Sequence, residues 1–489
     1  MASNQSISFG PPLPEPAVPL WQLLTRHAAS ERDRTAVHSV HQSIRWSYDD
    51  LVTRTEAVAK AWHAMDVTGS VAVLLSNCAE FSLSLFVAAR LGLHFTPLDP
   101  KSSRDVLKHY LDTIRPDVIV AEEGQSFEFL DSDASNSANV RLRIVVKNHG
   151  QTTSGTVGRS PDEKRKAHWT TFEELLSERH DTTRTLPSPP TDPEDVSAIC
   201  FTSGTTSKPK ACPHTGVSLS AMAASMSASL DFSPERKSLC HIPPYHIYGL
   251  AKHIVVFYSG ASTIYVSPTF DAGASLEAMT TGLCTDAAIV PAMYRMLKQH
   301  PSYQKGAINN MVAMACGGSM ISPEFVEDAK ISFNAEPVPG FGMTESMGIT
   351  VKAIREDIVH DGLAVGLGKP GYGVILKVCE ANSGSQEPLA QGSSGELHIS
   401  GPSVINGYLS SSDKQDDSFY IDQEGRRWFR TGDQARLGTD GTLYILGRFK
   451  DVIIRGGVNI APASIEAVLN KLDGVNVSTC HSPRIGIRF

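Results

Sequence analysis

Hydrophobic and polar positions in the first hundred residues alternate between strand-like and helix-like patterns. Residues 20–30 have helical spacing, and residues 43–65 predict a strand that leads into an amphipathic helix. Residues 70–77 ("SVAVLLSN") predict a strand, 79–93 a helix and 94–100 ("HFTPLDP") another strand. This alternation predicts a parallel sheet with crossover helices, which is an α/β fold.

The pattern then changes twice along the chain. Residues 131–195 are polar and rich in turn residues, with one predicted helix at 170–179, and are interpreted as surface excursions between two α/β units. Strand and helix patterns resume at 196, and from 363 short strands punctuated by glycine predict a small β-rich unit. Beyond Arg448 the order is strand, tight turn and helix. The predicted units are 1–195, 196–362, 363–447 and 448–489.

Composition and charge limit the class of protein. The chain has 489 residues, of which 41% are hydrophobic and 20% charged, with a net charge of −8. No long block of like charge indicates nucleic-acid binding. The eight cysteines form no CxxC pair, the N-terminus lacks a signal-peptide pattern, and the longest apolar segments are too short to span a bilayer. We expect a soluble cytoplasmic protein with reduced cysteines and no membrane span.

The stretch "CFTSGTTSKPK" (200–210) combines hydroxyl residues, one glycine and two lysines after an apolar segment. Gly204 allows backbone N–H groups to turn inward as an anion-binding nest, to which hydroxyl donors and the charge of Lys208 or Lys210 add. The hydroxyl residues concerned are Thr202, Ser203, Thr205 and Thr206. The spacing differs from that of a Walker A loop. A solvated Ser/Thr turn is the alternative interpretation.

Three further stretches fit a nucleoside triphosphate ligand. "FGMTES" places Thr344 and Glu345 after a predicted strand, where a carboxylate is a natural ligand for the Mg²⁺ that accompanies ATP. "RTGD" offers Asp433, whose two oxygens could accept hydrogen bonds from ribose hydroxyls. "PPYHIYGL" places His246 near Tyr248. Each stretch alone also fits a structural role: a solvated loop carboxylate, a common turn and a satisfied core histidine.

Taken together and in this order, the motifs resemble the adenylate-forming superfamily of acyl-CoA synthetases, adenylation domains and luciferases. The motifs include "FTSGTTSKPK", "GFGMTES", "GELHISGPSVINGY", "FRTGD" and "GRFKDVIIRGGVNIAPASIE". The "PPYHIYGL" and "GFGMTES" stretches look most like the 4-coumarate–CoA-ligase-like enzymes. The resemblance covers about residues 20–475. It implies a large N-terminal domain, made of two parallel-sheet α/β subdomains and a β-rich subdomain, followed here by a partial small C-terminal lobe.

The resemblance also implies roles for individual residues. Thr202, Ser203, Gly204, Thr205, Thr206 and Lys210 would hold the triphosphate, Thr344 and Glu345 the α-phosphate and Mg²⁺, and Asp433 and Arg448 the ribose. His246 would lie beside the reacting carboxylate, Lys450 at the hinge of the small lobe, and Gly456 and Gly457 along the path of coenzyme A. The acyl pocket would be lined by Tyr248, Gly317, Gly318, Gly340 and Phe341.

The implied activity is ATP-dependent activation of a carboxylic acid to an acyl-adenylate and then to a CoA thioester. Three of the pocket positions carry no side chain and Tyr248 is an aromatic wall, so we expect aromatic or medium-chain acids to be preferred over acetate. An adenylation module that loads an acyl-carrier protein is one alternative. The absence of an aspartate in "PPYHIYGL" argues against α-amino acids as its substrates.

The sequence departs from the family pattern in two ways, and the second supports a further alternative, a catalytically impaired nucleotide-binding protein. Ser207 and Ala211 stand where the family usually has glycine. The only lysine after Lys450 is Lys471, within a predicted helix, so the lysine that relatives carry near the end of the lobe has no counterpart. We therefore expect either a truncated or mis-spliced C-terminus or an enzyme without the complete lobe, and slow adenylation.

Overall fold

The structure of this chain is a computed structural model. The residues that it describes are 5–124, 129–130, 140–147, 169–177, 185–203, 208–351, 360–361, 364–381, 383–409, 416–451, 453–455, 458–460 and 465.

Some helices begin or end at residues typical of helix caps. Helix α2 has a capping box, in which Ser47 Oγ accepts from the Asp50 backbone N–H at 3.0 Å while Asp50 accepts from the Ser47 N–H at 2.9 Å. Gly92 ends α3 in the left-handed region, with φ 69°. The helices are α1 (Leu20–Ser30), α2 (Tyr48–Ala64), α3 (Ala79–Leu91), α4 (Arg104–Ile114), α6 (Phe172–Ser177), α7 (Gly216–Leu230), α8 (Ile247–Tyr258), α9 (Ala272–Thr280), α10 (Pro291–Gln299) and α11 (Pro323–Phe333).

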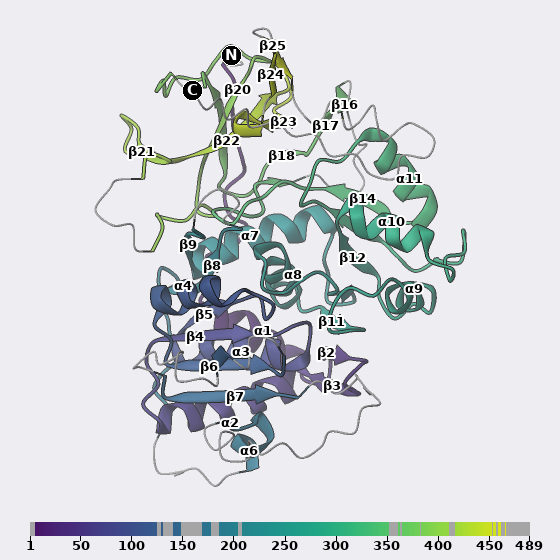
Figure 1. The fold of residues 1–489 in the computed structure, drawn as a ribbon. Coiled ribbons are helices and arrows are strands. Elements are labelled where there is room, and N and C mark those ends of the chain that lie inside the picture. The colour runs from purple at the N-terminus through teal and green to yellow at the C-terminus, as the bar shows by residue number, and fades with distance from the viewer. Residues whose placement is uncertain are drawn as a thin grey trace, which may run out of the picture.

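The first sheet has the strand order β7-β6-β4-β5-β8-β9 and is parallel except for the β8–β9 pair (Figure 1). Along β4, Val71 and Val73 pack with α2 and α3, whereas Ala72 and Leu74 pack with α4. Both faces are thus covered, which explains the unbroken apolar run. The strands are β4 (Ser70–Leu74), β5 (His94–Pro97), β6 (Val118–Glu122), β7 (Leu142–Val146), β8 (Val196–Phe201) and β9 (Ala211–Thr215).

The second sheet has the order β14-β13-β12-β10-β11-β2-β3, parallel up to the antiparallel β2–β3 edge. Helices α9, α10 and α11 pack in one cluster against it, while α8 packs with α1 and α3 in another. The strands are β2 (Thr35–Ser39), β3 (Ile44–Ser47), β10 (Lys237–Leu239), β11 (Ser262–Tyr265), β12 (Asp286–Ile289), β13 (Ala313–Cys316) and β14 (Glu336–Pro339).

The two sheets exchange strands across the predicted boundary at residue 195. The β2–β3 hairpin precedes that boundary and lies in the second sheet, whereas β8 and β9 follow it and lie in the first sheet. The exchange joins the two α/β units through one large apolar cluster that includes α1, α2, α3 and α8. The boundaries themselves stay a prediction.

The β-rich unit is an antiparallel sheet in the order β1-β19-β20-β22-β21, with β23 also paired to β22. Its core includes Leu376, Leu397, Ile399 and Phe429. The strands are β1 (Ile7–Phe9), β19 (Ile375–Cys379), β20 (Ser394–Ser400), β21 (Phe419–Ile421), β22 (Arg427–Leu437) and β23 (Leu443–Arg448). The predicted α/β class with two parallel-rich sheets and a β-rich part is confirmed.

Short two-stranded pairs complete the described elements. The predicted strand and tight turn beyond Arg448 correspond to the β24–β25 hairpin, while the helix predicted after it lies almost entirely outside the described residues. A short 3₁₀ helix, η4 (Phe449–Asp451), precedes this hairpin. The strands are β15 (Thr350–Val351), β16 (His360–Asp361), β17 (Ala364–Val365), β18 (Lys369–Pro370), β24 (Ile453–Arg455) and β25 (Val458–Ile460).

Strand β9 was not predicted from the sequence. It contains Pro213, which cannot donate to a ladder, and it lies at the edge of the first sheet, where proline is tolerated. Its pairing with β8 makes the hydroxyl loop the connection of a hairpin.

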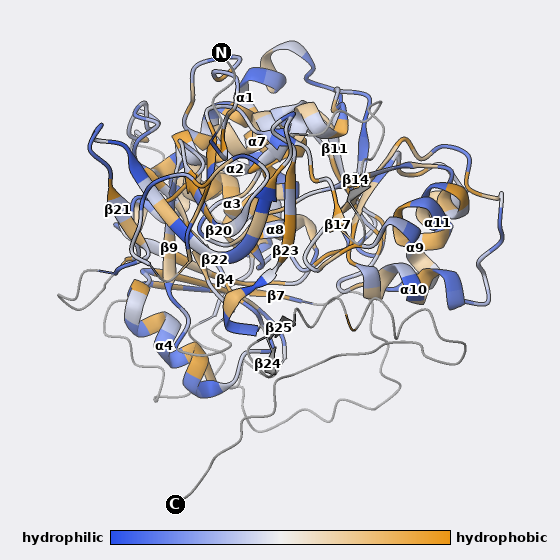
Figure 2. Ribbon diagram, turned by 90° about the horizontal axis from the view of Figure 1, so that it is seen from above, coloured by the Kyte–Doolittle hydropathy of each residue, from blue (hydrophilic) through white to orange (hydrophobic). Residues whose placement is uncertain are grey.

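Hydrophobic and hydrophilic residues are segregated as expected for helices that cover a core. Helix α4 carries both kinds (Figure 2), and its apolar residues Leu107, Leu111 and Ile114 are buried. Within the described part of the chain, every helix is too short or too polar to cross a membrane.

Candidate active site

The hydroxyl loop leaves the carboxyl end of β8, at the edge where ligands of parallel sheets usually bind. Its base is closed by two hydrogen bonds: the Thr202 N–H donates to the Lys210 carbonyl, and the Lys210 N–H donates to Thr202 Oγ1, both at 3.0 Å. Ser203 is exposed beside this base. The predicted loop residues Gly204, Thr205 and Thr206 lie outside the described residues.

Lys210 contacts two residues that lie between β20 and β21 of the β-rich sheet. Its Nζ lies 2.6 Å from Asp416 Oδ2 and 4.4 Å from the centre of the Tyr408 ring. Burial opposes ionisation of Asp416, but hydrogen bonds from Lys210 and Ser418 lower its pKa. The ammonium group of Lys210 therefore has a carboxylate partner in Asp416.

Glu345 lies on the other side of the same tyrosine. The Tyr408 hydroxyl donates to Glu345 Oε1 at 2.6 Å, and the Ile405 N–H donates to the Glu345 carbonyl at 3.0 Å. Burial and the charge of Glu345 raise the pKa of Tyr408, so the phenol stays protonated and is the donor. The structure thus connects Lys210 and Glu345, which lie far apart in the sequence, through one side chain.

The backbone of Thr344 is hydrogen-bonded to a residue of the β8–β9 hairpin. His214 Nε2, on β9, lies 2.9 Å from the Thr344 carbonyl oxygen. Burial lowers the pKa of His214 to about 4, against the effect of that carbonyl, so the ring is neutral at pH 7. The neutral ring donates this bond from a protonated Nε2.

Asp433 and Arg448 face each other across the β22–β23 pair. Arg448 Nε donates to Asp433 Oδ1 at 2.9 Å, while the buried Oδ2 has no hydrogen-bond partner among the described residues. Burial raises the pKa of Asp433 to about 6, with Arg448 and Lys450 opposing and Glu345 reinforcing the shift. The charges of Glu345 and Lys450 are thus close enough to Asp433 to affect the pKa of its carboxyl group. Lys450 is exposed in η4, while Gly456 and Gly457 lie outside the described residues.

His246 precedes the first turn of α8, and its ring lies tilted by 51° against that of Tyr245 with centroids 5.0 Å apart. The ring is solvent-accessible, yet the surrounding protein atoms desolvate it enough to lower its pKa, which the charge of Asp99 opposes. Burial and hydrogen bonding to Asp99 raise the pKa of Tyr245. His246 is therefore a mainly neutral group at pH 7.

The structure places three of the predicted acyl-pocket residues side by side. A methyl added at Gly317 would lie 3.3 Å from the Gly340 carbonyl oxygen and 3.9 Å from the Tyr248 ring, so these three residues are neighbours. A methyl at Gly340 would meet no atom within 4 Å among the described residues. Gly318 adopts φ 78°, and Phe341 packs against the core of the β-rich sheet.

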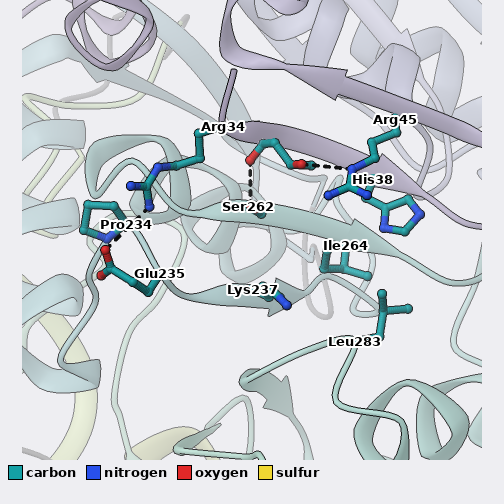
Figure 3. A pocket seen from close by; sticks show the side chains of 10 residues that line it. Arg34, His38, Arg45, Pro234, Glu235, Lys237, Ser262, Ile264 and Leu283 are labelled. Carbon is teal, nitrogen blue, oxygen red and sulfur yellow. Dashed lines mark hydrogen bonds and ion pairs between the residues drawn. The ribbon is translucent and has the colours of Figure 1, made fainter. Parts of the chain in front are cut away.

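A separate cavity of about 340 Å³ lies beside the first residues of β10 and β11 in the second sheet (Figure 3). Lys237 and Ser262, which begin β10 and β11, line it together with Arg34 and Arg45. Arg34 pairs with Glu235 at 3.7 Å, and Ser262 Oγ donates to the Thr35 carbonyl at 2.6 Å. Its lining residues include no residue of the predicted site, so the cavity is separate from that site.

Comparison with known proteins decides the family. The model of the family described as AMP-binding enzyme matches residues 24–409. This chain belongs to the AMP-binding enzyme family. The match contains the hydroxyl loop, Glu345 and Tyr408.

Among relatives in this family, an indoleacetate–CoA ligase of Aromatoleum aromaticum is 28% identical over 92% of this chain and 82% of its own length. A feruloyl-CoA synthase of Amycolatopsis is 26% identical with the same coverage. A crystal structure of ATP-bound MatB from Rhodopseudomonas palustris superposes with a TM-score of 0.80 at 22% identity, covering 94% of this chain and 85% of that chain. The predicted superfamily and the acid–thiol ligase class are confirmed.

Three residues of the site were missed by sequence reasoning. Tyr408 ends the "GPSVINGY" motif, where it follows Gly401 and Gly407. These glycines were the only sequence feature that could have drawn attention to it. His214 lies on the unpredicted strand β9. Asp416 lies in a polar stretch without any pattern, so only the tertiary contact with Lys210 identifies it.

Proposed function

We propose that this chain uses ATP to convert a carboxylic acid to an acyl-adenylate and then transfers the acyl group to coenzyme A. CoA ligases that align with more than nine-tenths of the chain support this activity. The observation that carries it is the contact of Lys210 and Glu345 with one tyrosine, because it joins the predicted phosphate loop to the predicted metal carboxylate.

The proposed ATP site lies around this contact. Thr202, Ser203 and Lys210 would hold the triphosphate together with Gly204, Thr205 and Thr206. Asp433 would hold the ribose, and its Oδ2, which lacks a partner among the described residues, is a fitting acceptor for a hydroxyl group. Arg448 would orient that carboxylate through its bond to Oδ1.

The residues present fit a magnesium ion that arrives with the nucleotide. Mg²⁺ is usually bound by one or two carboxylates together with substrate phosphates and waters. The described residues contain no cluster of three or more metal-ligating side chains, and Glu345 is a partly exposed carboxylate with one oxygen engaged by Tyr408. When bound, the ion would neutralise charge on the phosphate oxygens.

The chemistry explains why the site needs these residues. A carboxylate is a poor acyl donor because its leaving group is oxide, so its oxygen attacks the α-phosphorus of ATP and pyrophosphate leaves. Negative charge gathers on the phosphate oxygens, where Lys210 and the hydroxyl donors stabilise it. His246, mainly neutral, would position the reacting carboxylate without a competing charge. The thiol of coenzyme A then attacks the acyl carbon, and AMP leaves.

The substrate class follows from the three neighbours in the proposed acyl pocket. Gly317 and Gly340 contribute no side chain, and the aromatic ring of Tyr248 lies beside Gly317. A planar ring could stack on Tyr248 within such a space. We infer that aromatic or medium-chain acids are preferred over acetate.

Two alternatives stay open and differ in the acceptor or in activity. The adenylate could be passed to a carrier protein instead of coenzyme A, with the same site residues. The chain could also bind ATP without efficient adenylation.

The test is acid-dependent exchange of labelled pyrophosphate into ATP, followed by analysis of products with coenzyme A. A panel from acetate to ring-sized and medium-chain acids should give exchange that is strongest for the larger acids, and a CoA thioester with the best of them. Exchange without a thioester would favour the carrier-protein alternative. Absence of exchange together with ATP binding would favour the impaired protein, and equal turnover of acetate and ring-sized acids would refute the substrate class.

A further inference from the structure

Tyr408 contacts both proposed phosphate-binding and metal-binding groups, and it does so with different parts of its side chain. Its hydroxyl donates to Glu345 Oε1 at 2.6 Å, and the face of its ring lies 4.4 Å from Lys210 Nζ. The first contact is a hydrogen bond to an ionised acceptor and the second is a cation–π contact. A phenylalanine would keep the second contact and lose the first.

The backbone around Tyr408 is fixed on both sides. The Leu409 N–H donates to the Ala211 carbonyl at 2.9 Å, next to Lys210, and the Ile405 N–H donates to the Glu345 carbonyl at 3.0 Å. The Tyr408 ring also packs edge-on against Phe419, with centroids 5.5 Å apart. The segment 405–409 therefore spans the two motifs with little freedom to shift.

We propose that Tyr408 is a positioning residue for the adenylation step: its hydroxyl orients the Glu345 carboxylate toward Mg²⁺, and its ring places the Lys210 ammonium over the triphosphate. This inference rests on the proposed function. Because the Tyr408 hydroxyl engages Oε1, Oε2 would be the oxygen of Glu345 that holds a metal ion. The ring would stay in contact with Lys210 when the ammonium binds phosphate in place of Asp416.

Asp416 is the carboxylate that a bound triphosphate would have to replace at Lys210. The side chain of Lys210 is 43% exposed and that of Asp416 21% exposed, so their pair is partly solvated and contributes little to stability. A phosphate with greater charge can displace Asp416 at small cost, while the ring contact persists.

The experiment compares Tyr408→Phe and Tyr408→Leu with the full-length wild-type chain. Pyrophosphate exchange is measured against Mg²⁺ at saturating ATP, and against ATP at saturating Mg²⁺. Binding of MgATP and of ATP with EDTA is measured independently by the shift of the thermal unfolding midpoint. Tyr420→Phe is the matched control, because its hydroxyl also makes a 2.8 Å bond, to His398 Nδ1, within the β-rich sheet.

Tyr408→Phe should raise the Mg²⁺ concentration needed for half-maximal exchange by about 3- to 10-fold, the loss expected for a charge-assisted hydrogen bond, with little change in the KM for ATP. Tyr408→Leu should in addition raise the KM for ATP by about 2- to 5-fold through loss of the ring contact. The stabilisation by MgATP over ATP with EDTA should shrink in Tyr408→Phe and not in Tyr420→Phe.

The proposal fails if Tyr408→Phe matches Tyr420→Phe in Mg²⁺ dependence, or if Tyr408→Leu has the KM for ATP of Tyr408→Phe. A merely structural role would lower the unfolding midpoint of the variants without changing Mg²⁺ dependence. If the wild type shows no exchange with any acid, the proposed function fails, and the MgATP-induced shift of Tyr408→Phe still decides the role of Tyr408.

Discussion

Arg448 Nε donates to Asp433 Oδ1 at 2.9 Å, and Asp433 Oδ2 is buried without a hydrogen-bond partner among the described residues. Only one of the two carboxylate oxygens therefore has a hydrogen bond from the described residues, and burial of the ionised group is costly. The pKa of about 6 for Asp433 expresses this balance, since burial outweighs the charge of Arg448.

A first prediction concerns stability as a function of pH. Because the pKa of Asp433 is raised from 3.8 to about 6, the folded chain binds this proton more tightly than the unfolded chain. The stabilisation by the protonated form is present at low pH and is lost as the pH rises through 6. Asp433→Asn stays neutral, so its unfolding free energy relative to wild type should increase between pH 4 and 7.5, by up to about 3 kcal/mol.

Urea unfolding of both proteins across that pH range measures this difference. A difference that stays constant with pH would contradict a raised pKa at Asp433. The same variant should bind ATP more weakly, because an amide offers one acceptor oxygen where the ribose would meet a carboxylate.

A second prediction concerns the phosphate loop. Lys210→Ala should lower kcat/KM for ATP by about 10- to 100-fold, because a charge directed at the phosphates is lost. Lys208→Ala is the matched control: its side chain is exposed on the same loop, and an effect below about threefold is expected from a screened surface charge. Equal effects of the two substitutions on pyrophosphate exchange would show that Lys210 has no special role.

Ser207→Gly, which restores the residue usual in relatives at this position, should be neutral or mildly favourable for ATP use. Asp416→Asn should lower the KM for ATP by about 2- to 5-fold, because ATP no longer has to displace an ionic partner worth up to about 1 kcal/mol. A higher KM in Asp416→Asn would mean that Asp416 helps to bind nucleotide.

A third prediction concerns acid selectivity. The methyl group of Gly317→Ala would lie 3.9 Å from the Tyr248 ring and would fill part of the proposed pocket. We expect kcat/KM for ring-sized acids to fall by about 10-fold or more, while that for acetate changes little. Gly124→Ala, whose added methyl meets no atom within 4 Å in the part of the chain that the structure describes, is the control. Equal losses for large and small acids would contradict the assignment of Gly317 to the pocket.

A fourth prediction concerns the buried ion pair between Lys252 on α8 and Asp286 on β12, whose side chains are 0% and 2% exposed. Lys252→Met or Asp286→Asn leaves one buried group without its partner and should lower the free energy of unfolding by about 3–5 kcal/mol. The double variant should lose less than the sum. The exposed pair Lys108–Asp112, 3.1 Å apart, is the control, with an expected loss of at most about 1 kcal/mol on substitution of Lys108 by Ala. Additive losses in the buried pair would contradict coupling.

The sequence by itself determined the α/β class, the central strands and the motifs, because these depend on local patterns. Residues 70–77 predict a strand of a parallel sheet, and the structure places β4 inside the first sheet with both of its faces covered. The glycine and hydroxyl residues of the loop, and Glu345 after β14, could be assigned as candidates because each follows a strand end.

Only the tertiary structure decided which residues meet. The β2–β3 hairpin lies in the second sheet, although its neighbours in sequence form the first, and β8–β9 lies in the first sheet. Sequence patterns could not predict this exchange, because strand pairing depends on spatial proximity and leaves no local pattern. Asp416 lies 206 positions from Lys210, and a surface carboxylate in a polar stretch has no signature until the fold brings it within 2.6 Å of that ammonium. Tyr408 likewise has a role only because the pairing of Leu409 with Ala211 holds its ring between the two motifs.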